Sequence, residues 1–199
     1  MKRLAALAAA VLLAPSAAFA GNWNIDGAHS TAGFAVRHMM VSKAKGQFNK
    51  LSGKLALDDK DVTKSSIEAT IDVASIDTNN GKRDEHLRSP DFFDAEKFPS
   101  ITFKSTKVEK NGKDALKVTG DLTMHGVTKS VVLDATLSGP ATNPWGQVVR
   151  GVEAKAKINR KDFGLTWNKT LETGGVVVGD EVEISIDAEF NPEQAEVKK

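Results

Sequence analysis

The chain has 199 residues, no cysteine and a formal net charge of +1 at pH 7, with 27 basic and 26 acidic residues. This balance argues against a nucleic-acid-binding protein, because such proteins neutralise phosphates with an excess of Lys and Arg. Without cysteine the fold must be stable without disulfides, and a chain of this length can bury enough surface in one domain to achieve that.

Residues 1–20 are typical of a secretory signal peptide. Lys2 and Arg3 supply the positive start, residues 4–14 form an apolar run too short to span a bilayer, and Ala18-Phe19-Ala20 fits the small-x-small pattern of a cleavage site. The alternative is a retained membrane anchor. The pattern predicts removal of residues 1–20 and an exported protein, located in the periplasm or secreted.

We expect the mature chain to begin at Gly21 and to form one domain over residues 21–191, followed by a polar tail over residues 192–199. In most of this domain apolar and polar residues alternate, which is typical of strands that hide one face. The predicted strands cover residues 30–40, 45–57 (with a turn or bulge at Ser52-Gly53), 66–76, 101–108, 116–124, 131–137, 148–158 and 182–190. Turn signals lie at Asn111-Gly112, Ser138-Gly139-Pro140, Asn143-Pro144 and Gly174-Gly175.

One segment, residues 83–99, breaks the alternation. Residues 84–88 suit one or two helical turns, and Pro90 and Pro99 limit any longer helix. The segment also carries Phe92, Phe93 and Phe98, whose large apolar area must be buried somewhere. We therefore expect a short helical insert, over about residues 80–98, that closes one end of the β-structure. It can act either as a moving lid or as a fixed cap of the core.

About eight one-sided strands satisfy either a two-sheet sandwich or a closed barrel. The inward stripes favour an all-β, extended eight-stranded antiparallel barrel, because their large residues are mostly aliphatic and many others are small, which leaves an elongated hollow. These small residues are Ala32, Ala69, Ala135, Ala154, Ala156 and Ala188. The alternative is that they only allow close sheet packing, and the interior is then solid.

The residues that could carry chemistry are few. The four histidines, His29, His38, His86 and His125, show no zinc-ligand spacing, and no nucleophile elbow of the Gly-x-Ser-x-Gly type occurs. Asp84-Glu85 could form an acid/base pair, although a solvated helix start is the simpler interpretation. We therefore predict no catalytic residue, no metal and no cofactor.

Two arginines of the insert, Arg83 and Arg88, are the better functional candidates, since a guanidinium binds phosphate through two parallel hydrogen bonds. The alternative is that both form surface ion pairs with Asp84, Glu85 or Asp91, which are common and weak.

Seven motifs, taken in order, resemble the YceI family of exported proteins over residues 23–190. They are Trp23-x-Ile25-Asp26-x-x-His29-Ser30, Phe34-x-Val36-x-His38, Gly46-x-Phe48, Arg83-Asp84-x-His86-Leu87 with Asp91-Phe92-Phe93-Asp94, Phe98-Pro99-x-Ile101-x-Phe103-x-Ser105, Gly120-x-Leu122-Thr123-x-x-Gly126-Val127-Thr128 and Arg160-x-Asp162-Phe163-Gly164-Leu165-x-Trp167. Each motif is weak alone, but the ordered set is specific, and the chain shows no clear departure from the family's pattern.

The resemblance implies a lipocalin-like barrel whose interior holds a polyisoprenoid, a quinone-like lipid or a fatty-acyl amphiphile as ligand. It also implies a periplasmic or secreted location, an association with stress responses, and transient contact with a membrane or a membrane protein. Apolar binding of this kind needs a ligand with many buried carbons, because each CH₂ contributes only about 0.8 kcal/mol while association costs roughly 4–15 kcal/mol.

We therefore predict an exported lipid-binding protein that serves in transport, storage or a stress response, and not an enzyme. The alternatives are an enzyme acting on the bound lipid with histidine and carboxylate groups at the mouth, and an interaction protein with a solid core. The predicted ligand-binding residues of the barrel lining and its mouth are Phe34, Val36, His38, Ile71, Arg83, His86, Phe92, Phe93, Phe103, Leu122, Leu133, Ala154, Trp167 and Ile186.

Overall fold

The alternating segments form strands in the computed structural model, which describes residues 21–172 and 174–193. The predicted signal peptide and most of the predicted tail lie outside the described residues. The strands are β1 (Gly21–His38), β2 (Ser42–Phe48), β3 (Leu51–Leu57), β4 (Ser66–Asp72), β5 (Ile76–Asp77), β6 (Ser100–Lys110), β7 (Ala115–Met124), β8 (Val127–Leu137), β9 (Ala141–Thr142), β10 (Val148–Asn159) and β11 (Val178–Pro192). The helices are α1 (Gly81–Arg88) and three 3₁₀ turns, η1 (Val62–Lys64), η2 (Val73–Ser75) and η3 (Arg160–Phe163).

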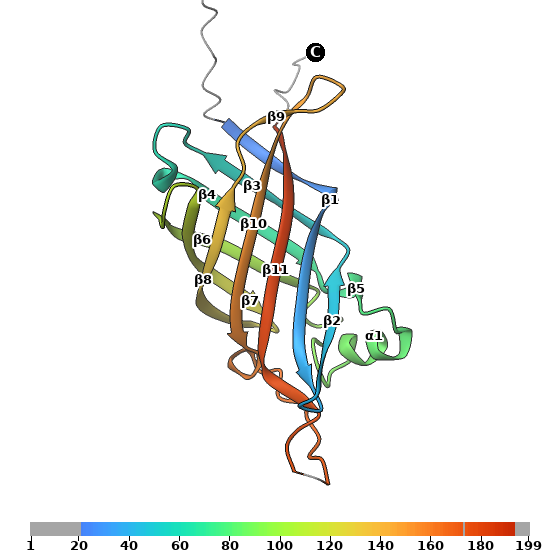
Figure 1. Ribbon diagram of the computed structural model, residues 1–199. Coiled ribbons are helices and arrows are strands. Elements are labelled where there is room, and N and C mark those ends of the chain that lie inside the picture. The colour runs from blue at the N-terminus through green and yellow to red at the C-terminus, as the bar shows by residue number, and fades with distance from the viewer. Residues whose placement is uncertain (1–20, 173, 194–199) are drawn as a thin grey trace, which may run out of the picture.

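Eight of these strands close into an antiparallel barrel (Figure 1). Their order is β1-β3-β4-β6-β7-β8-β10-β11, and β11 pairs back with β1. Closure gives the backbone groups of the first and last strands a partner, so no open sheet edge remains between them. The prediction of an extended eight-stranded antiparallel barrel is confirmed, and the sandwich alternative is wrong.

The long strand β1 pairs with β11 along one edge and with two different strands along the other. Its first residues pair with β3 and its last residues with β2, and a register shift lies between Asp26 and Thr31. The chain breaks between β2 and β3 at Asn49 and Lys50, so the turn predicted at Ser52-Gly53 is wrong. Gly53 instead lies inside β3, where a Cβ atom would collide with the carbonyl of Glu68 on β4. The glycine marks a close approach of two strands and not a turn.

The helical insert lies beside the barrel wall next to β2 and β5 (Figure 1). The predicted helix exists as α1, whose first turn is capped by Asn80, since its side chain accepts a hydrogen bond from the Arg83 amide at 3.1 Å. The helix ends at Ser89, before Pro90. Residues 89–99 then lead back to β6, where the Val73 amide donates to the Pro99 carbonyl at 2.9 Å. Because β5 has only two residues and ends the pairing order, the insert covers the side of the barrel that β5 leaves unpaired.

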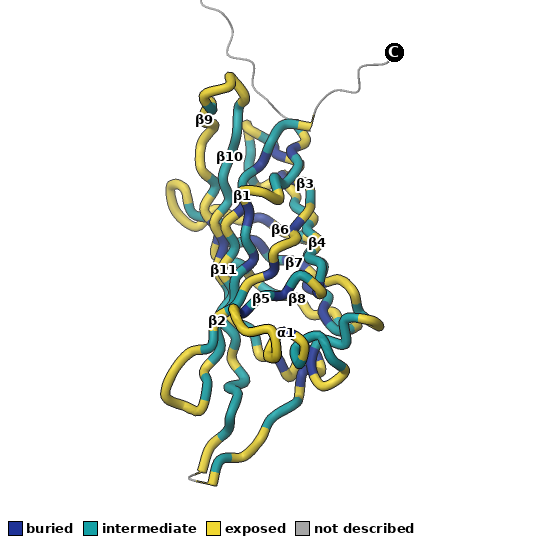
Figure 2. Tube along the Cα trace, turned by 90° about the vertical axis from the view of Figure 1, so that its right-hand side faces the viewer, coloured by how far each residue is buried: buried dark blue, intermediate teal, exposed yellow. Residues whose placement is uncertain are grey.

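Buried residues line the inside of the barrel, and exposed residues gather at its tips and loops (Figure 2). The end that carries β9 is filled by a packed cluster of Trp23, Leu55, Leu57, Ala188 and Phe190. Trp23 and Phe190 are 1% and 0% exposed. The barrel is therefore solid at the β9 end. None of the described helices has the length and apolar character needed to cross a bilayer.

Candidate functional site: an apolar cavity with a polar mouth

An apolar cavity of about 370 Å³ occupies the rest of the barrel interior, a volume within the usual range of ligand pockets. Among the described residues that line it, the exposed ones are Arg37 and Arg83, which lie near the α1 end, so we place its opening there. We call this opening the mouth; it is bounded by His38, Arg83, His86, Phe92, Phe93 and Trp167. Over this part of its length the described barrel is hollow, which contradicts the alternative of an entirely solid core.

All fourteen residues predicted for the site line this cavity. Eight come from the strands and form its wall: Phe34, Val36, Ile71, Phe103, Leu122, Leu133, Ala154 and Ile186. Six lie at the mouth: His38, Arg83, His86, Phe92, Phe93 and Trp167. Their role in binding a ligand stays a prediction, because their place on the wall shows only that they can reach one.

Two aromatic rings of the wall lie over glycines. A Cβ atom on Gly46 would collide with the ring of Phe34, and one on Gly120 would collide with the ring of Phe103. Each ring therefore occupies the space that a side chain at the glycine would fill. The glycines keep the interior open beside two of its largest side chains.

Aromatic side chains from α1, the insert and the segment after η3 meet at the mouth. The His86 ring packs edge-on against Phe92 and Trp167, with centroid distances of 5.0 and 4.9 Å, and Phe92 and Trp167 are 5.1 Å apart. Phe93 packs edge-on against Phe48 of β2 at 5.8 Å. These contacts join the insert to both sides of the opening, which is the geometry that closure over a ligand requires.

Phe98 differs from the other two phenylalanines of the insert. We expected all three to close the barrel over the ligand, but Phe98 does not line the cavity. Its ring packs against His125 in the turn between β7 and β8, with the centroids 4.7 Å apart. Phe98 thus anchors the end of the insert to the β7–β8 turn, off the cavity.

The Arg83 guanidinium is fixed by Thr78 and not by an acidic side chain. Arg83 Nε donates to Thr78 Oγ1 and its Nη2 donates to the Thr78 carbonyl, both at 2.7 Å. Thr78 Oγ1 in turn donates to Asp84 Oδ1, which also accepts the Thr78 amide at 2.9 Å. Asp84 is only 7% exposed, so the prediction of a solvated helix start is wrong for this residue. The network holds a cation at the mouth without an ion pair among the described residues.

Arg88 lies away from the cavity. Its Nη1 is 3.4 Å from the carbonyls of Ala74 and Ile76, which ties α1 to η2 and β5. The role predicted for it near a head group is therefore not supported by its position. The predicted ion pairs with Asp84, Glu85 and Asp91 are also not formed by the described side chains.

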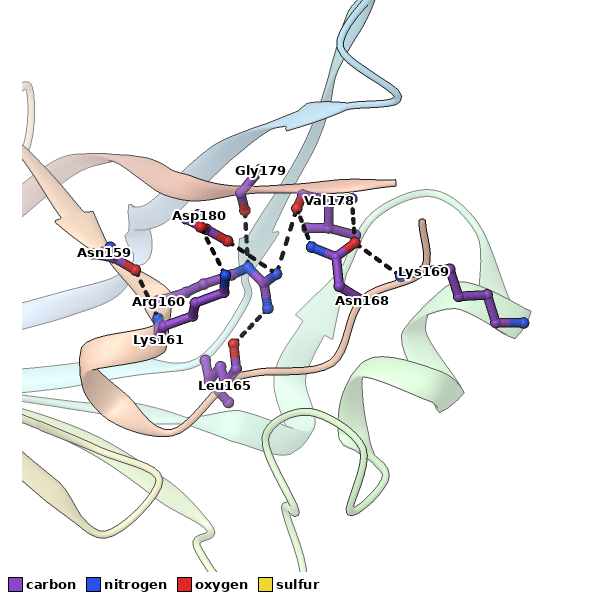
Figure 3. Close-up of polar contacts among 9 residues, drawn as sticks. All are labelled: Asn159, Arg160, Lys161, Leu165, Asn168, Lys169, Val178, Gly179 and Asp180. Atoms are coloured by element: carbon purple, nitrogen blue, oxygen red, sulfur yellow. Dashed lines mark hydrogen bonds and ion pairs between the residues drawn. The ribbon is translucent and has the colours of Figure 1, made fainter. Parts of the chain in front are cut away.

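One buried arginine, Arg160, begins the seventh motif but is not among the predicted site residues; Figure 3 shows its polar contacts. Arg160 is 4% exposed, and its guanidinium donates to the carbonyls of Gly179 at 2.8 Å, Leu165 at 2.5 Å and Val178 at 3.4 Å. Burial lowers the pKa of Arg160 and the nearby Asp180 opposes this effect, but a guanidinium stays protonated in proteins. Arg160 joins the segment after η3 to the start of β11 and also reaches the cavity wall.

Histidines and carboxylates meet in two places among the described residues. At the mouth His86 Nε2 lies 3.0 Å from Asp91 Oδ2, the kind of pair that the enzyme alternative needs, but no described Ser or Thr hydroxyl bonds to that ring. Outside the barrel, Asp26, His29 and Glu189 bring possible metal-ligand atoms within 4.8 Å of one another. The Asp26–His29 hydrogen bond, at 3.1 Å, lowers the pKa of Asp26 and raises the pKa of His29.

Comparison with known proteins supports the same family throughout. The sequence matches the YceI-like domain over residues 23–190. It is 44% identical over 160 residues to a UPF0312 protein of Photorhabdus laumondii, covering 79% of this chain and 83% of that one. It is 41% identical over 171 residues to a UPF0312 protein of Staphylococcus aureus, covering 85% and 97%.

Solved structures share the fold. The YCEI protein of Campylobacter jejuni is 35% identical with a TM-score of 0.68, covering 79% of this chain and 90% of that one. BcnA of Burkholderia cenocepacia is 26% identical with a TM-score of 0.73, covering 83% and 98%. A domain of Saccharophagus degradans described as polyisoprenoid-binding has a TM-score of 0.64 at 18% identity, covering 86% and 98%, and shows the fold alone. The motifs, the closed barrel and these matches together place the chain in the YceI family.

Proposed function

We propose that this protein is an exported carrier that holds a long-chain isoprenoid or similar amphiphile, with the tail in the barrel and the head group at the mouth. The observation that carries the proposal is the cavity itself, which is apolar along its wall and opens beside a fixed guanidinium. A narrow apolar channel that ends at a cation matches a molecule with a long hydrocarbon tail and a polar or anionic head.

The shape of the interior also limits the ligand class. Because Trp23 and Phe190 pack the β9 end of the described barrel, the proposed route for entry and release of a ligand is through the mouth. Sugars and nucleotides would place unpaired polar groups against aliphatic walls, which is unfavourable. The Saccharophagus degradans domain described as polyisoprenoid-binding has the same fold, which agrees with the proposal, although its low identity does not carry the ligand across. Storage, transport and a stress response are all compatible with such a carrier.

The direct test is to extract the purified, folded protein with organic solvent and identify the extract by mass spectrometry. We expect one long-chain lipid in a near-stoichiometric amount, and uptake of a geranylgeranyl or fatty-acyl probe after the native lipid is removed. Protein that yields no lipid and takes up neither probe would overturn the proposal. Conversion of the bound probe to a hydrolysed product would favour the enzyme alternative, for which the His86–Asp91 pair is the specific observation.

A further inference from the structure

The turn between β1 and β2 exposes three consecutive apolar side chains. Met39 is 44% exposed, Met40 is 59% exposed and Val41 is 81% exposed. The strand predicted to reach Met40 ends at His38 instead, and the Val41 amide closes the turn by donating to the His38 carbonyl at 3.1 Å. We call Met39–Val41 the apolar tip.

The backbone of the apolar tip is unfavourable for the residues that occupy it. Met39 and Met40 have φ angles of 48° and 62°, in the left-handed region that Gly, Asn and Asp adopt more easily. A hairpin turn with two positive φ angles is normally built with Asn-Gly, which would be both less strained and more polar. The turn is thus both strained in its backbone and exposed in its apolar side chains, and each of these features can indicate a functional surface.

The apolar tip stands at the mouth of the cavity. The two residues before it, Arg37 and His38, line the cavity. The Met39 amide donates at 2.8 Å to the carbonyl of Val177, which belongs to the segment that also carries Trp167. Figures 1 and 2 show this turn at the α1 end of the barrel, opposite the end that carries β9.

Positive charge lies directly behind the apolar tip. Arg37 and Lys43 face each other across the β1–β2 ladder, an unfavourable arrangement of like charges in a free sheet. Lys43 binds the Glu183 carboxylate at 2.6 and 2.7 Å, which leaves this group of three side chains with one excess positive charge. Exposed apolar side chains with a positive charge behind them would gain both apolar burial and electrostatic attraction at an anionic membrane surface.

We propose that the apolar tip is a membrane-docking element that inserts into a lipid bilayer with anionic head groups. Docking presses the mouth against the bilayer, so a ligand passes between the membrane and the barrel without crossing water. The docking itself follows from the tip, whereas ligand transfer rests on the proposed function.

The test is co-sedimentation of the mature protein with vesicles of phosphatidylcholine, with and without phosphatidylglycerol. The variant M40S/V41S removes exposed apolar area from two residues that do not line the cavity. We expect it to lower vesicle binding about tenfold or more. The matched control is Trp145→Ser, which removes an 83% exposed aromatic residue near β9, at the opposite end, and should leave vesicle binding unchanged. Lys43→Gln should weaken binding only to vesicles that contain phosphatidylglycerol.

A second variant, M39N/M40G, separates docking from folding. It gives the turn residues that prefer positive φ, so we expect a higher Tm together with lower vesicle binding, a pair of changes that a purely structural turn would not show. The proposal would be overturned if wild-type protein bound neither kind of vesicle. It would also be overturned if M40S/V41S and Trp145→Ser lowered vesicle binding equally. Uptake of a soluble short-chain prenyl probe, measured on the same variants, should not change. If wild-type protein takes up no probe, the proposed carrier function is wrong, but the docking result remains valid.

Discussion

At the scale of single residues, the mouth carries one cation held in a defined place. Thr78 fixes the Arg83 guanidinium, and the buried Asp84 fixes Thr78 in turn. Arg83 donates to a hydroxyl and a carbonyl and forms no direct ion pair among the described residues, while the buried Asp84 carboxylate lies one hydroxyl away, beyond Thr78 Oγ1. An anionic head group would be its first direct ionic partner.

We expect Arg83→Ala to weaken a pyrophosphate-headed ligand more than a neutral-headed ligand with the same tail. Hydrogen bonds to charged groups contribute about 1.5–3 kcal/mol, so the difference should be about tenfold or more in Kd. Binding titrations with the matched ligands measure it. Arg88→Ala is the control, since Arg88 lies off the cavity. If Arg83→Ala weakened the binding of both ligands equally, the head group would bind at another site.

Arg160 illustrates a different use of a guanidinium. It is buried and its hydrogen bonds go to backbone carbonyls, so its substitution leaves buried acceptors without donors. We expect Arg160→Leu to lower the free energy of unfolding by about 3 kcal/mol or more in urea denaturation. The neighbouring Lys161 forms an exposed ion pair with Asp180 at 2.9 Å, so Lys161→Ala should change stability by less than about 1 kcal/mol. Similar small losses in both variants would contradict a structural role for Arg160.

At the scale of elements, successive side chains of β10 point alternately into the barrel and out of it. Ala154 is 5% exposed and lines the cavity, and the next residue, Lys155, faces outward. We expect Ala154→Phe to abolish probe uptake with a modest change in stability, because the new ring fills ligand space. Lys155→Phe is the matched control and should bind the probe normally. In a close-packed core the larger residue would instead destabilise the protein by about 1–3 kcal/mol. If Ala154→Phe lost stability by that amount and still took up the probe normally, the ligand would not bind beside Ala154.

Two phenylalanines of the insert allow a second comparison of matched variants. Phe93 lines the cavity and packs against Phe48, whereas Phe98 packs outside against His125. Phe93→Ala should speed ligand release several-fold for charged and neutral head groups alike, because it opens the apolar seal without changing charge. Phe98→Ala should leave the release rate nearly unchanged once its effect on stability is corrected for. Stopped-flow displacement of a fluorescent probe measures both rates, and faster release in both variants would mean that the whole insert moves as one lid.

At the scale of the whole molecule, the barrel has two unlike ends. The β9 end is filled by Trp23, Phe190 and their neighbours, and the α1 end opens through an aromatic and cationic mouth. In the proposed function, a cavity that opens at this end would take up the tail of the ligand and leave its head group at the surface. The apolar tip lies at that same surface.

Export is the prediction that belongs to this scale. Ala18-Phe19-Ala20 predicts that mature protein from the native host begins at Gly21. Intact-mass and N-terminal analysis of the exported fraction checks this directly. An intact Met1 in that fraction would instead support a retained N-terminal anchor.

The sequence by itself determined most of the barrel, because a period of two with one apolar face leaves a strand few ways to hide that face. It predicted the positions of eight strands, the short helix and fourteen residues that line the cavity. It also predicted the hollow, since small residues such as Ala154 repeat on the inward stripes. Even the wrong turn at Ser52-Gly53 had a local reason, because glycine marks both turns and close strand contacts.

Only the tertiary structure decided which charged and aromatic side chains reach the mouth. Asp84 is buried because Thr78 satisfies it from the loop before α1, and Arg160 is buried because backbone carbonyls of Leu165, Val178 and Gly179 satisfy it. Sequence spacing does not reveal such partners. Phe93 and Phe98 are five residues apart, yet the return of the insert to β6 places one inside the cavity and the other outside. The closed end, the open end and the exposed Met39–Val41 turn likewise follow from how strands far apart in sequence come together, which is set by register and closure and not by local pattern.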